Sequence, residues 1–488
     1  MKSARPTRRW AIGAAGAALF AMLGTAIVPA HGFAPTPAPA GANPRAPARE
    51  PNILFILIDD MGFADLSLTG NKLVATPNID ALARDGMVMT QFYDAAPICS
   101  PSRAGFMTGR FPARDRFVTY IHDRKRNRAF GQADWLAPSL PVWPRMMRQA
   151  GYTTGHFGKW HLGGGRDIGD APLPSAYGFD ESYTQWEGLG PRVLPTDLTN
   201  KLGQQSAELG QGPVEWLPRA EITRRFVDKT LDFVGRSKDR PWFAQLWLTD
   251  MHTPWVPSAE QLAATKGKGA TPREDQFLAV LVAMDAEIGR LIDGLRQAGE
   301  LDDTLIVFTS DNGPTIGANA PGSAAPYRGR KASLYEGGIR QPLIIRWPGH
   351  IAAGGRDAQS VAQAVDLLPT LAAITGAPTP AGIDGIDMSA AWRGRPIASR
   401  PDIYSHIARP GGEAFGPLYS IRSGPWKLLM NSDGGGVELY NIERDPRERH
   451  DRTATEPTIV KTLTAKLANW IAGLPAPVAR VARGQAAL

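Results

Sequence analysis

The chain has 488 residues, 54 Lys and Arg against 47 Asp and Glu, and a single cysteine. Hydrophobic residues make up 43% of the sequence and charged residues 21%, which excludes a disordered or fibrous chain. At roughly 150 residues per domain, the length allows two or three domains, or one large domain with an appendage. One cysteine excludes an intramolecular disulfide and a zinc site built from two or more thiolates.

Residues 1–30 have the pattern of an export signal peptide. Four basic residues precede an apolar stretch at residues 10–28, and no acidic residue occurs among them. The adjacent pair Arg8 and Arg9 points to the twin-arginine route. An uncleaved membrane anchor is the alternative, since about 19 apolar residues can just span a bilayer. The many small residues favour cleavage, and we expect an exported protein, periplasmic or secreted.

Loss of the signal peptide changes the charge balance. Its four positive charges leave 50 basic against 47 acidic residues in the remainder of the chain. We therefore expect no nucleic-acid partner, and no membrane contact beyond the export signal. Residues 31–50 are rich in Pro and Ala and are predicted to form a linker.

Short apolar runs alternate with helical patterns over the next 300 residues. Runs without polar alternation predict strands that are buried on both faces, as in a parallel sheet. These runs are residues 53–58, 152–157, 242–248 and 304–309, and the helical patterns are residues 79–84, 142–150, 223–234 and 274–297. The predicted fold is α/β, with a large, mostly parallel sheet sandwiched by helices. Polar residues follow several runs, which places the site at the carboxyl ends of the strands.

The pattern changes after about residue 375. Short strands with Gly-rich turns are predicted at 419–422, 426–430 and 437–440, followed by an amphipathic helix at 458–471. We therefore predict a catalytic domain at 51–375 and a smaller α+β subdomain with an antiparallel sheet at 376–488.

Two polar pairs directly follow predicted strands. Asp59 and Asp60 follow the first strand, Asp311 and Asn312 follow the fourth, and a glycine lies close behind each pair. Oxygen ligands from two loops suit a hard cation such as Ca²⁺ or Mg²⁺ rather than zinc. Helix N-capping is the alternative reading of one such pair. The repetition of the pattern favours a metal site.

The single cysteine, Cys99, begins the sequence CSPSR (residues 99–103), which continues to MTGR (residues 107–110). Pro101 can open a helix whose positive end would attract an anion to residue 99. A lone cysteine is ordinarily a buried core residue, but this one stands among Ser, Pro and Arg. An unpaired thiol is also vulnerable to oxidation in an exported protein. These surroundings indicate a modified cysteine.

The segment at 99–110 resembles the signature of the type I sulfatases, members of the alkaline phosphatase superfamily in which this cysteine becomes Cα-formylglycine. Further segments resemble other elements of the family: they are 51–60, 155–163, 311–313, Lys331 with 335–338, and 438–441 with 445–446. The resemblance spans about residues 51–450. It implies a sulfuric ester hydrolase, arylsulfatase-like, acting on a carbohydrate or aryl sulfate.

The resemblance also implies a role for each matching residue. Asp59, Asp60, Asp311 and Asn312 would hold a divalent cation, usually Ca²⁺, with the formylglycine at 99 as a further ligand. Arg103 and Lys159 would steady the formylglycine hydrate, and His161 would take the proton that lets sulfate leave. Lys331 and His252 would bind the sulfate, with His252 placed to protonate or hydrogen-bond the leaving oxygen. The implied partners are a sulfated small molecule or sugar and a formylglycine-generating maturation enzyme.

The chemistry explains why the nucleophile is an aldehyde hydrate. One of its two hydroxyls attacks sulfur, helped by a cation that lowers its pKa. The second hydroxyl can then lose its proton and expel sulfate by C–O cleavage, which regenerates the aldehyde. A serine has no second hydroxyl and would stall as a sulfate ester. The nearby cations supply the positive charge that a sulfate transition state needs.

Other residues are weaker candidates. The basic segment 117–128 is either a solvated loop or a pocket rim that recognises substrate. Further rim candidates are Trp186, Trp255, Tyr327 and Arg328, since aromatic rings suit sugar faces or aryl rings, although they also fill cores. Of the remaining histidines, His31 falls in the linker, His350 and His450 in surface-like segments and His156 in a strand, whereas His122 and His406 are left undecided.

Two other functions compete with the sulfatase reading. The first is a phosphonate or phosphate ester hydrolase of the same superfamily, which can share the cysteine signature. The second is an inactive protein that binds sulfated glycans. The adjacent aspartates and the Asp-Asn pair favour a sulfatase over the first, and the complete set of polar positions argues against the second. The sequence makes no prediction of the oligomeric state.

Overall fold

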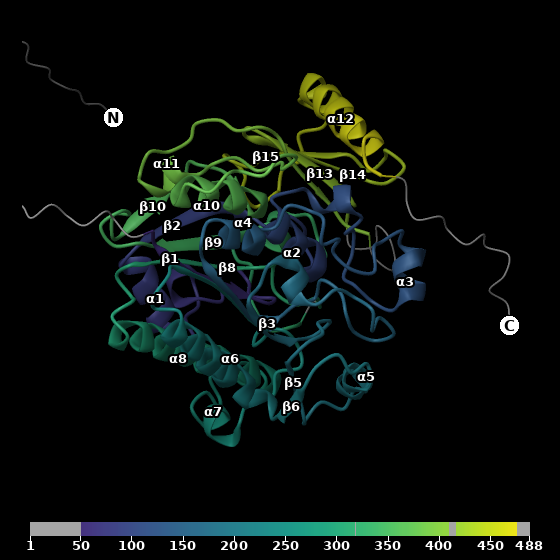
Figure 1. Ribbon diagram of the computed structural model, residues 1–488. Helices are drawn as coiled ribbons and strands as arrows, with labels where there is room; N and C mark the ends of the chain where they lie inside the picture. Colours follow the sequence, from purple (N-terminus) through teal and green to yellow (C-terminus); the bar gives the residue numbers. More distant parts are fainter. Residues whose placement is uncertain (1–49, 318, 409–415, 476–488) are drawn as a thin grey trace, which may run out of the picture. The chain divides into compact units, whose positions relative to one another are not determined.

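The computed structural model describes residues 50–317, 319–408 and 416–475 (Figure 1). The predicted signal peptide and all but the last residue of the predicted linker lie outside these ranges. Within them, none of the helices combines the length and the apolar character that crossing a bilayer requires.

The main sheet has 11 strands within the described residues and is mostly parallel. In spatial order the path runs β10 (Gly355–Asp357), β2 (Met87–Tyr93), β9 (Arg340–Arg346), β8 (Thr304–Ser310), β1 (Asn52–Ile58), β7 (Trp242–Leu248), β3 (Thr153–Lys159), β4 (Glu181–Gln185), β5 (Arg192–Pro195) and β6 (Val214–Leu217), with β11 (Ala362–Gln363) also paired to β2. Strand β9 runs antiparallel to both of its neighbours, β2 and β8. The predicted fold class is confirmed.

The central strand β1 shows why continuous apolar runs form this sheet. Every residue of β1 is buried, and the strand pairs in parallel with β7 on one side and β8 on the other. Successive side chains point to opposite faces, so Phe55 belongs to one hydrophobic core and its neighbours Leu54 and Ile56 to the other. Both faces of β1 are therefore covered, as the run predicted.

Helices cover the two faces separately. The α-helices are α1 (Pro77–Arg84), α2 (Cys99–Thr108), α3 (Arg124–Ala129), α4 (Trp143–Gln149), α5 (Leu202–Glu208), α6 (Arg219–Arg236), α7 (Ala259–Ala263), α8 (Pro272–Gln297), α9 (Glu336–Ile339), α10 (Leu367–Thr375), α11 (Ser389–Trp392) and α12 (Pro457–Ala472). Apolar residues of α1, α6 and α8 fill one core, and those of α2, α4 and α10 fill the other. Figure 1 shows α6 and α8 side by side, and the two helices contact each other.

A second sheet follows in the C-terminal part of the chain. Its four antiparallel strands are β12 (Ile403–His406), β13 (Tyr419–Ser423), β14 (Trp426–Met430) and β15 (Glu438–Asn441). Leu463 and Leu467 of α12 pack with residues of this sheet, among them Leu428, in a small core of their own. The antiparallel sheet and closing helix agree with the sequence prediction.

Candidate active site

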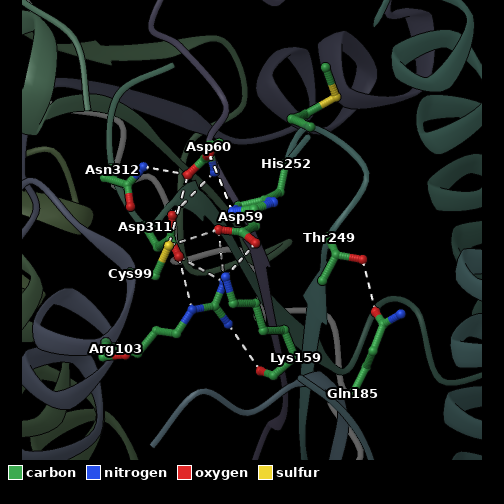
Figure 2. A network of polar contacts seen from close by, with 12 residues as sticks. Asp59, Asp60, Cys99, Arg103, Lys159, Gln185, Thr249, His252, Asp311 and Asn312 are labelled. Atoms are coloured by element: carbon green, nitrogen blue, oxygen red, sulfur yellow. Dashed lines mark hydrogen bonds and ion pairs between the residues drawn. The ribbon is translucent and has the colours of Figure 1, made fainter. Parts of the chain in front are cut away.

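The polar residues singled out in the sequence meet at the carboxyl ends of the central strands (Figure 2). Asp59 and Asp60 follow β1 at once, and Asp311 and Asn312 follow β8, its parallel neighbour. Four more come from other elements: Lys159 ends β3, His161 follows two residues later, His252 follows β7, and Cys99 is the first residue of α2. Lys331 lies between β8 and α9. Parallel pairing brings residues far apart in sequence to one edge.

The backbone after β1 and β8 is held in a specific turn. Asp60 adopts a left-handed conformation with φ 63°, and its N–H donates to Asp311 Oδ1 at 3.2 Å. The hydroxyl of Ser310 donates to the carbonyl of Ile58 and accepts from the N–H of Met61. These contacts orient both aspartates of the first loop toward the second loop.

Carboxylate oxygens and the Cys99 sulfur gather closely enough to surround a cation. One potential ligand atom from each of Asp59, Asp60, Cys99 and Asp311 lies within 4.8 Å of all the others, and all four residues are buried. The amide nitrogen of Asn312 donates to Asp60 Oδ1 at 2.8 Å, whereas its buried Oδ1 has no hydrogen-bond partner in the described part of the chain. Buried polar atoms are ordinarily satisfied, so this orphaned oxygen fits a cation ligand. The donor set suits a hard divalent ion.

Each of the three carboxylates has its own basic partner. Lys159 Nζ lies 2.6 Å from Asp59 Oδ2, Lys331 Nζ lies 2.5 Å from Asp60 Oδ1, and Arg103 Nη2 lies 2.7 Å from Asp311 Oδ2.

Burial opposes the charge of Asp59, but Lys159 and the other cations hold its pKa well below the ordinary value. Burial and the charge of Asp59 raise the pKa of Asp311 to about 7. Of these two carboxylates, Asp59 carries the better stabilised negative charge.

The cysteine lies inside this charged cluster and not in an apolar core. Its Sγ is 3.3 Å from Asp59 Oδ1, 3.9 Å from Asp60 Oδ1 and 3.2 Å from Lys331 Nζ. Burial and the charge of Asp59 raise the pKa of the Cys99 thiol to about 12. Since the thiolate is the reactive form, the unmodified residue is a poor nucleophile.

Two histidines lie beside the cluster. His161 is buried and has φ 54°, and its Nδ1 has no hydrogen-bond partner among the described residues. Burial and the charge of Lys159 hold the pKa of His161 well below its ordinary value. His252 Nδ1 lies 2.7 Å from the Thr253 carbonyl, which can only accept, so Nδ1 carries the proton. His252 Nε2 lies 4.0 Å from Asp60 Oδ2.

Of the two tryptophans named as rim candidates, one lies in the core and the other lies beside His161. Trp255 is wrong as a rim residue: it is buried in the core against Phe277, and its N–H donates to the Met251 carbonyl. Trp186 is half-buried, and its carbonyl accepts from the N–H of His161.

The other two rim candidates lie where the two sheets meet. Tyr327 is half-buried, and Arg328 is exposed, with its guanidinium over the ring of Tyr335. Arg328 also donates to the hydroxyl of Tyr440.

The remaining sequence candidates are structural or exposed. His156 lies in β3 as predicted and is buried, and burial lowers its pKa to about 3. His350 and His450 are exposed. His406 stacks on Tyr419 in the second sheet. The basic segment 117–128 includes most of α3, and within it His122 contacts Asp123 and Arg126.

Sequence reasoning missed several residues close to the site. The Thr315 hydroxyl donates to Asp60 Oδ2 at 3.2 Å, and the Thr249 hydroxyl donates to Gln185 Oε1 at 2.9 Å (Figure 2). Asp94 is buried, neither of its side-chain oxygens has a hydrogen-bond partner within the described ranges, and burial and the charge of Asp311 raise its pKa. Threonine and glutamine carry no distinctive signal, but an aspartate five residues before the cysteine could have been noted.

Comparisons with known proteins agree with this geometry. The sulfatase family model matches residues 51–377, and the model described as N-sulphoglucosamine sulphohydrolase, C-terminal, matches residues 329–473. Human arylsulfatase A is 32% identical over 445 residues, which are 86% of this chain and 82% of that protein. N-acetylgalactosamine-6-sulfatase of Canis lupus familiaris is 30% identical over 396 residues, which are 75% of this chain and 70% of that protein.

Solved structures agree as well. The crystal structure of Ps i-CgsB in complex with k-i-k-neocarrahexaose has a TM-score of 0.74 and 29% identity, and the match covers 86% of this chain and 93% of that chain. The phosphonate monoester hydrolase of Agrobacterium radiobacter, at 22% identity and a TM-score of 0.61, shares the fold. With the family model covering most of the described residues and the site, the chain belongs to the sulfatase family and is a sulfuric ester hydrolase.

Proposed function

We propose that the chain hydrolyses a sulfate monoester of a carbohydrate or an aryl alcohol, using formylglycine formed from Cys99 and a divalent cation, Ca²⁺ or Mg²⁺. The observation that carries this proposal is the position of the Cys99 sulfur, between Asp59 Oδ1 at 3.3 Å and Lys331 Nζ at 3.2 Å. A thiol with its pKa raised to about 12 is a poor nucleophile there, and its conversion to an aldehyde hydrate would remove that obstacle.

The cation would be held by residues of the two loops after β1 and β8. These ligands are Asp59, Asp60, Asp311 and Asn312, with the modified residue 99. The orphaned Oδ1 of Asn312 and the close approach of the carboxylates support this set. When bound, such a cation lowers the pKa of a coordinated hydroxyl and offsets charge on sulfate oxygens.

The basic residues would balance and orient the reacting groups. Arg103 and Lys159 pair with Asp311 and Asp59, beside residue 99, and would steady the formylglycine hydrate. The hydrate supplies one hydroxyl to attack sulfur and a second whose deprotonation releases sulfate. Because the pKa of His161 lies well below its ordinary value, its imidazole is neutral and would accept that proton.

Lys331 and His252 would bind the sulfate group. Lys331 reaches both Asp60 and the Cys99 sulfur, so its charge is already directed at the reaction centre. Burial lowers the pKa of His252 to about 4, but an anionic sulfate nearby would favour the charged form. His252 could then hydrogen-bond or protonate the leaving oxygen through Nε2, since Nδ1 is bonded to the Thr253 carbonyl.

The names of the relatives support the substrate class. They include an arylsulfatase and an N-acetylgalactosamine-6-sulfatase, and a structure at 29% identity was solved with k-i-k-neocarrahexaose. We therefore propose a sulfated sugar or small aryl sulfate as substrate. We also propose a formylglycine-generating enzyme as a maturation partner and export to the periplasm or beyond, supported by the N-terminal sequence pattern.

Conversion of Cys99 is the test of this function. In protein co-expressed with a maturation enzyme, peptide mass spectrometry should show residue 99 lighter than cysteine. The converted protein should hydrolyse 4-nitrophenyl sulfate, and Cys99→Ala should lower the rate roughly 10³-fold or more. Cys99→Ser is the matched control, because serine has one hydroxyl and lacks the second hydroxyl of the formylglycine hydrate.

Three outcomes would contradict the proposal. Full activity in Cys99→Ala would refute the nucleophile. A dominant rate on an aryl phosphate diester would assign the protein to phosphate or phosphonate ester hydrolysis. Binding of sulfated sugars without turnover in converted protein would make it a binding protein.

A further inference from the structure

The loop after β7 is held from behind by one buried arginine. Arg219, the first residue of α6, donates from Nη2 to the carbonyl of Thr249 at 2.9 Å and to the carbonyl of His252 at 2.6 Å. It therefore spans the two ends of the segment 249–252. This segment leads from the end of β7 to the imidazole beside Asp60.

Among the described residues, no carboxylate forms a direct ion pair with the buried Arg219, although the charges of Asp250, Asp59 and Asp197 partly offset the cost of its burial. Arg219 is only 8% exposed, and within the described part of the chain its guanidinium forms no salt bridge. Nη1 has no hydrogen-bond partner there. Burial lowers the pKa of Arg219. A buried charge whose hydrogen-bond acceptors are backbone carbonyls is expensive, which favours a role in placing those carbonyls.

The same helix holds the middle of the segment. Thr223 lies one turn after Arg219 on α6, and its hydroxyl donates to Asp250 Oδ2 at 2.6 Å. The backbone N–H of Arg219 in turn donates to both carboxylate oxygens of Asp197, at 3.1 and 3.0 Å. On the other side, Thr249 donates to Gln185 (Figure 2). The first turn of α6 thus fixes the loop at three residues.

We propose that Arg219 is a positioning residue for His252, holding the carbonyls of Thr249 and His252 so that Nε2 of His252 stays directed at the reaction centre. This inference rests on the proposed function, in which His252 contacts the leaving oxygen. Without Arg219 the segment can shift, and a misplacement of about 1 Å can cost on the order of 100-fold in rate. The loss should grow as the leaving group becomes more basic, since such a group depends most on a proton donor.

A cavity beside the arginine provides a direct test. Arg219, Thr249 and Asp250 line a cavity of about 730 Å³ between α6, α7 and α8. The space left by Arg219→Ala therefore adjoins this cavity, through which a small cation can reach the carbonyls. Guanidinium, at concentrations well below those that unfold the protein, should restore part of the lost rate. Methylammonium, which lacks the planar fork, should restore less.

The experiment compares converted wild type, Arg219→Ala, Arg219→Lys, His252→Ala and the double variant on aryl sulfates whose leaving groups span a range of pKa values. Arg219→Ala should lower kcat by on the order of 100-fold for the most basic leaving group and much less for 4-nitrophenyl sulfate. In the His252→Ala background the same change should have little further effect. Arg219→Lys keeps a donor and should lose less.

Arg346→Ala is the matched control. Arg346 is also buried and donates to a loop carbonyl, that of Leu301, but this loop precedes β8 at the opposite end of the strands. It should lower stability without changing the dependence on the leaving group. If Arg219→Ala does not fold, Arg219→Lys takes its place, and its kcat should depend more steeply on the leaving-group pKa than that of wild type.

The outcomes separate the two proposals. If converted wild type hydrolyses no sulfate ester, the proposed function fails. If wild type is active but the arginine variants show an unchanged leaving-group dependence, no rescue by guanidinium, or full additivity with His252→Ala, only the positioning role of Arg219 is overturned.

Discussion

At the candidate site, acidic and basic side chains are matched one to one. Asp311 is paired with Arg103 through two nitrogens, at 2.9 and 2.7 Å, and both side chains are fully buried. Arg103 also donates to the carbonyl of Lys159 at 3.0 Å and stacks over the ring of Trp247. The guanidinium thereby joins the strand that carries Lys159 to the loop that carries Asp311. Such a pair contributes to the placement of the charges as well as to their balance.

We predict that Arg103→Met destabilises the protein by about 3–5 kcal/mol, because the substitution leaves Asp311 buried without its partner. Arg114→Met is the matched control: Arg114 pairs with Asp384, but its side chain is 35% exposed. Loss of that pair should cost only about 1 kcal/mol or less. Urea unfolding followed by circular dichroism measures both variants.

The Arg103–Asp311 pair can also be tested through catalysis. Arg103→Met should also abolish turnover of 4-nitrophenyl sulfate by converted protein, whereas Arg114→Met should retain it. Equal losses of stability in the two variants would contradict the argument, as would wild-type turnover in Arg103→Met.

At the scale of elements, the segment that carries Lys331 is supported by the second sheet. Glu336, at the start of α9, accepts from Lys427 of β14 at 2.9 Å and from Arg340 of β9 at 3.0 Å. Lys427 also pairs with Glu448 at 2.9 Å. Burial alone would raise the pKa of Glu336, but Lys427 and Arg340 lower it to about 2. The network is buried and joins the two sheets.

We predict that Lys427→Met lowers the free energy of unfolding by about 3–5 kcal/mol, because it leaves two buried carboxylates, Glu336 and Glu448, without their shared cation. Lys466→Met on α12 is the control, since Lys466 pairs with Asp402 and its side chain is 44% exposed. That change should cost about 1 kcal/mol or less. A Lys427→Met protein as stable as Lys466→Met would show that the network does not hold the sheets together.

The sequence predicted strands well where the buried run is almost entirely apolar. The runs that became β1, β7 and β8 are continuous and apolar, so composition alone revealed them. Strands β2 and β9 were missed, because MVMTQFY and RQPLIIR mix polar residues into the run. The polar residues have partners that only the fold supplies: Arg340 donates to the carbonyl of Thr90.

For the candidate site, the sequence predicted the ionisable residues but not the residues that hold them in place. Its ionisable residues were found because they follow strands or lie within signature segments. Arg219 and Thr315 were missed for a common reason. Each acts through a backbone carbonyl or another side chain, and the pairing depends on parallel strand order, which no local pattern contains. Trp255 was named as a rim candidate with a core position as the alternative, because aromatic composition does not distinguish a core ring from a sugar-facing one, and the structure places it in the core.

For the molecule as a whole, the candidate cation site exists only when distant segments are brought together. Its ligand residues extend from Asp59 to Asn312, and Lys331 closes the cluster from a later loop. An unfolded chain cannot present these oxygens within a few ångströms of one another. A cation at the site should therefore bind the folded state alone, and its binding free energy adds to stability.

We predict that a chelator lowers both the turnover of 4-nitrophenyl sulfate and the Tm of the converted protein, and that added Ca²⁺ or Mg²⁺ restores them. A cation at 100 times its Kd should add about 2.7 kcal/mol to the free energy of unfolding, seen as a Tm that rises with cation concentration. Asn312→Ala removes the orphaned oxygen while leaving the three carboxylates, and it should shift the cation titration to higher concentrations. Asn431→Ala, in a turn of the second sheet, should leave the titration unchanged. A wild-type Tm that does not respond to either cation would refute the metal site, since binding restricted to the folded state must raise it.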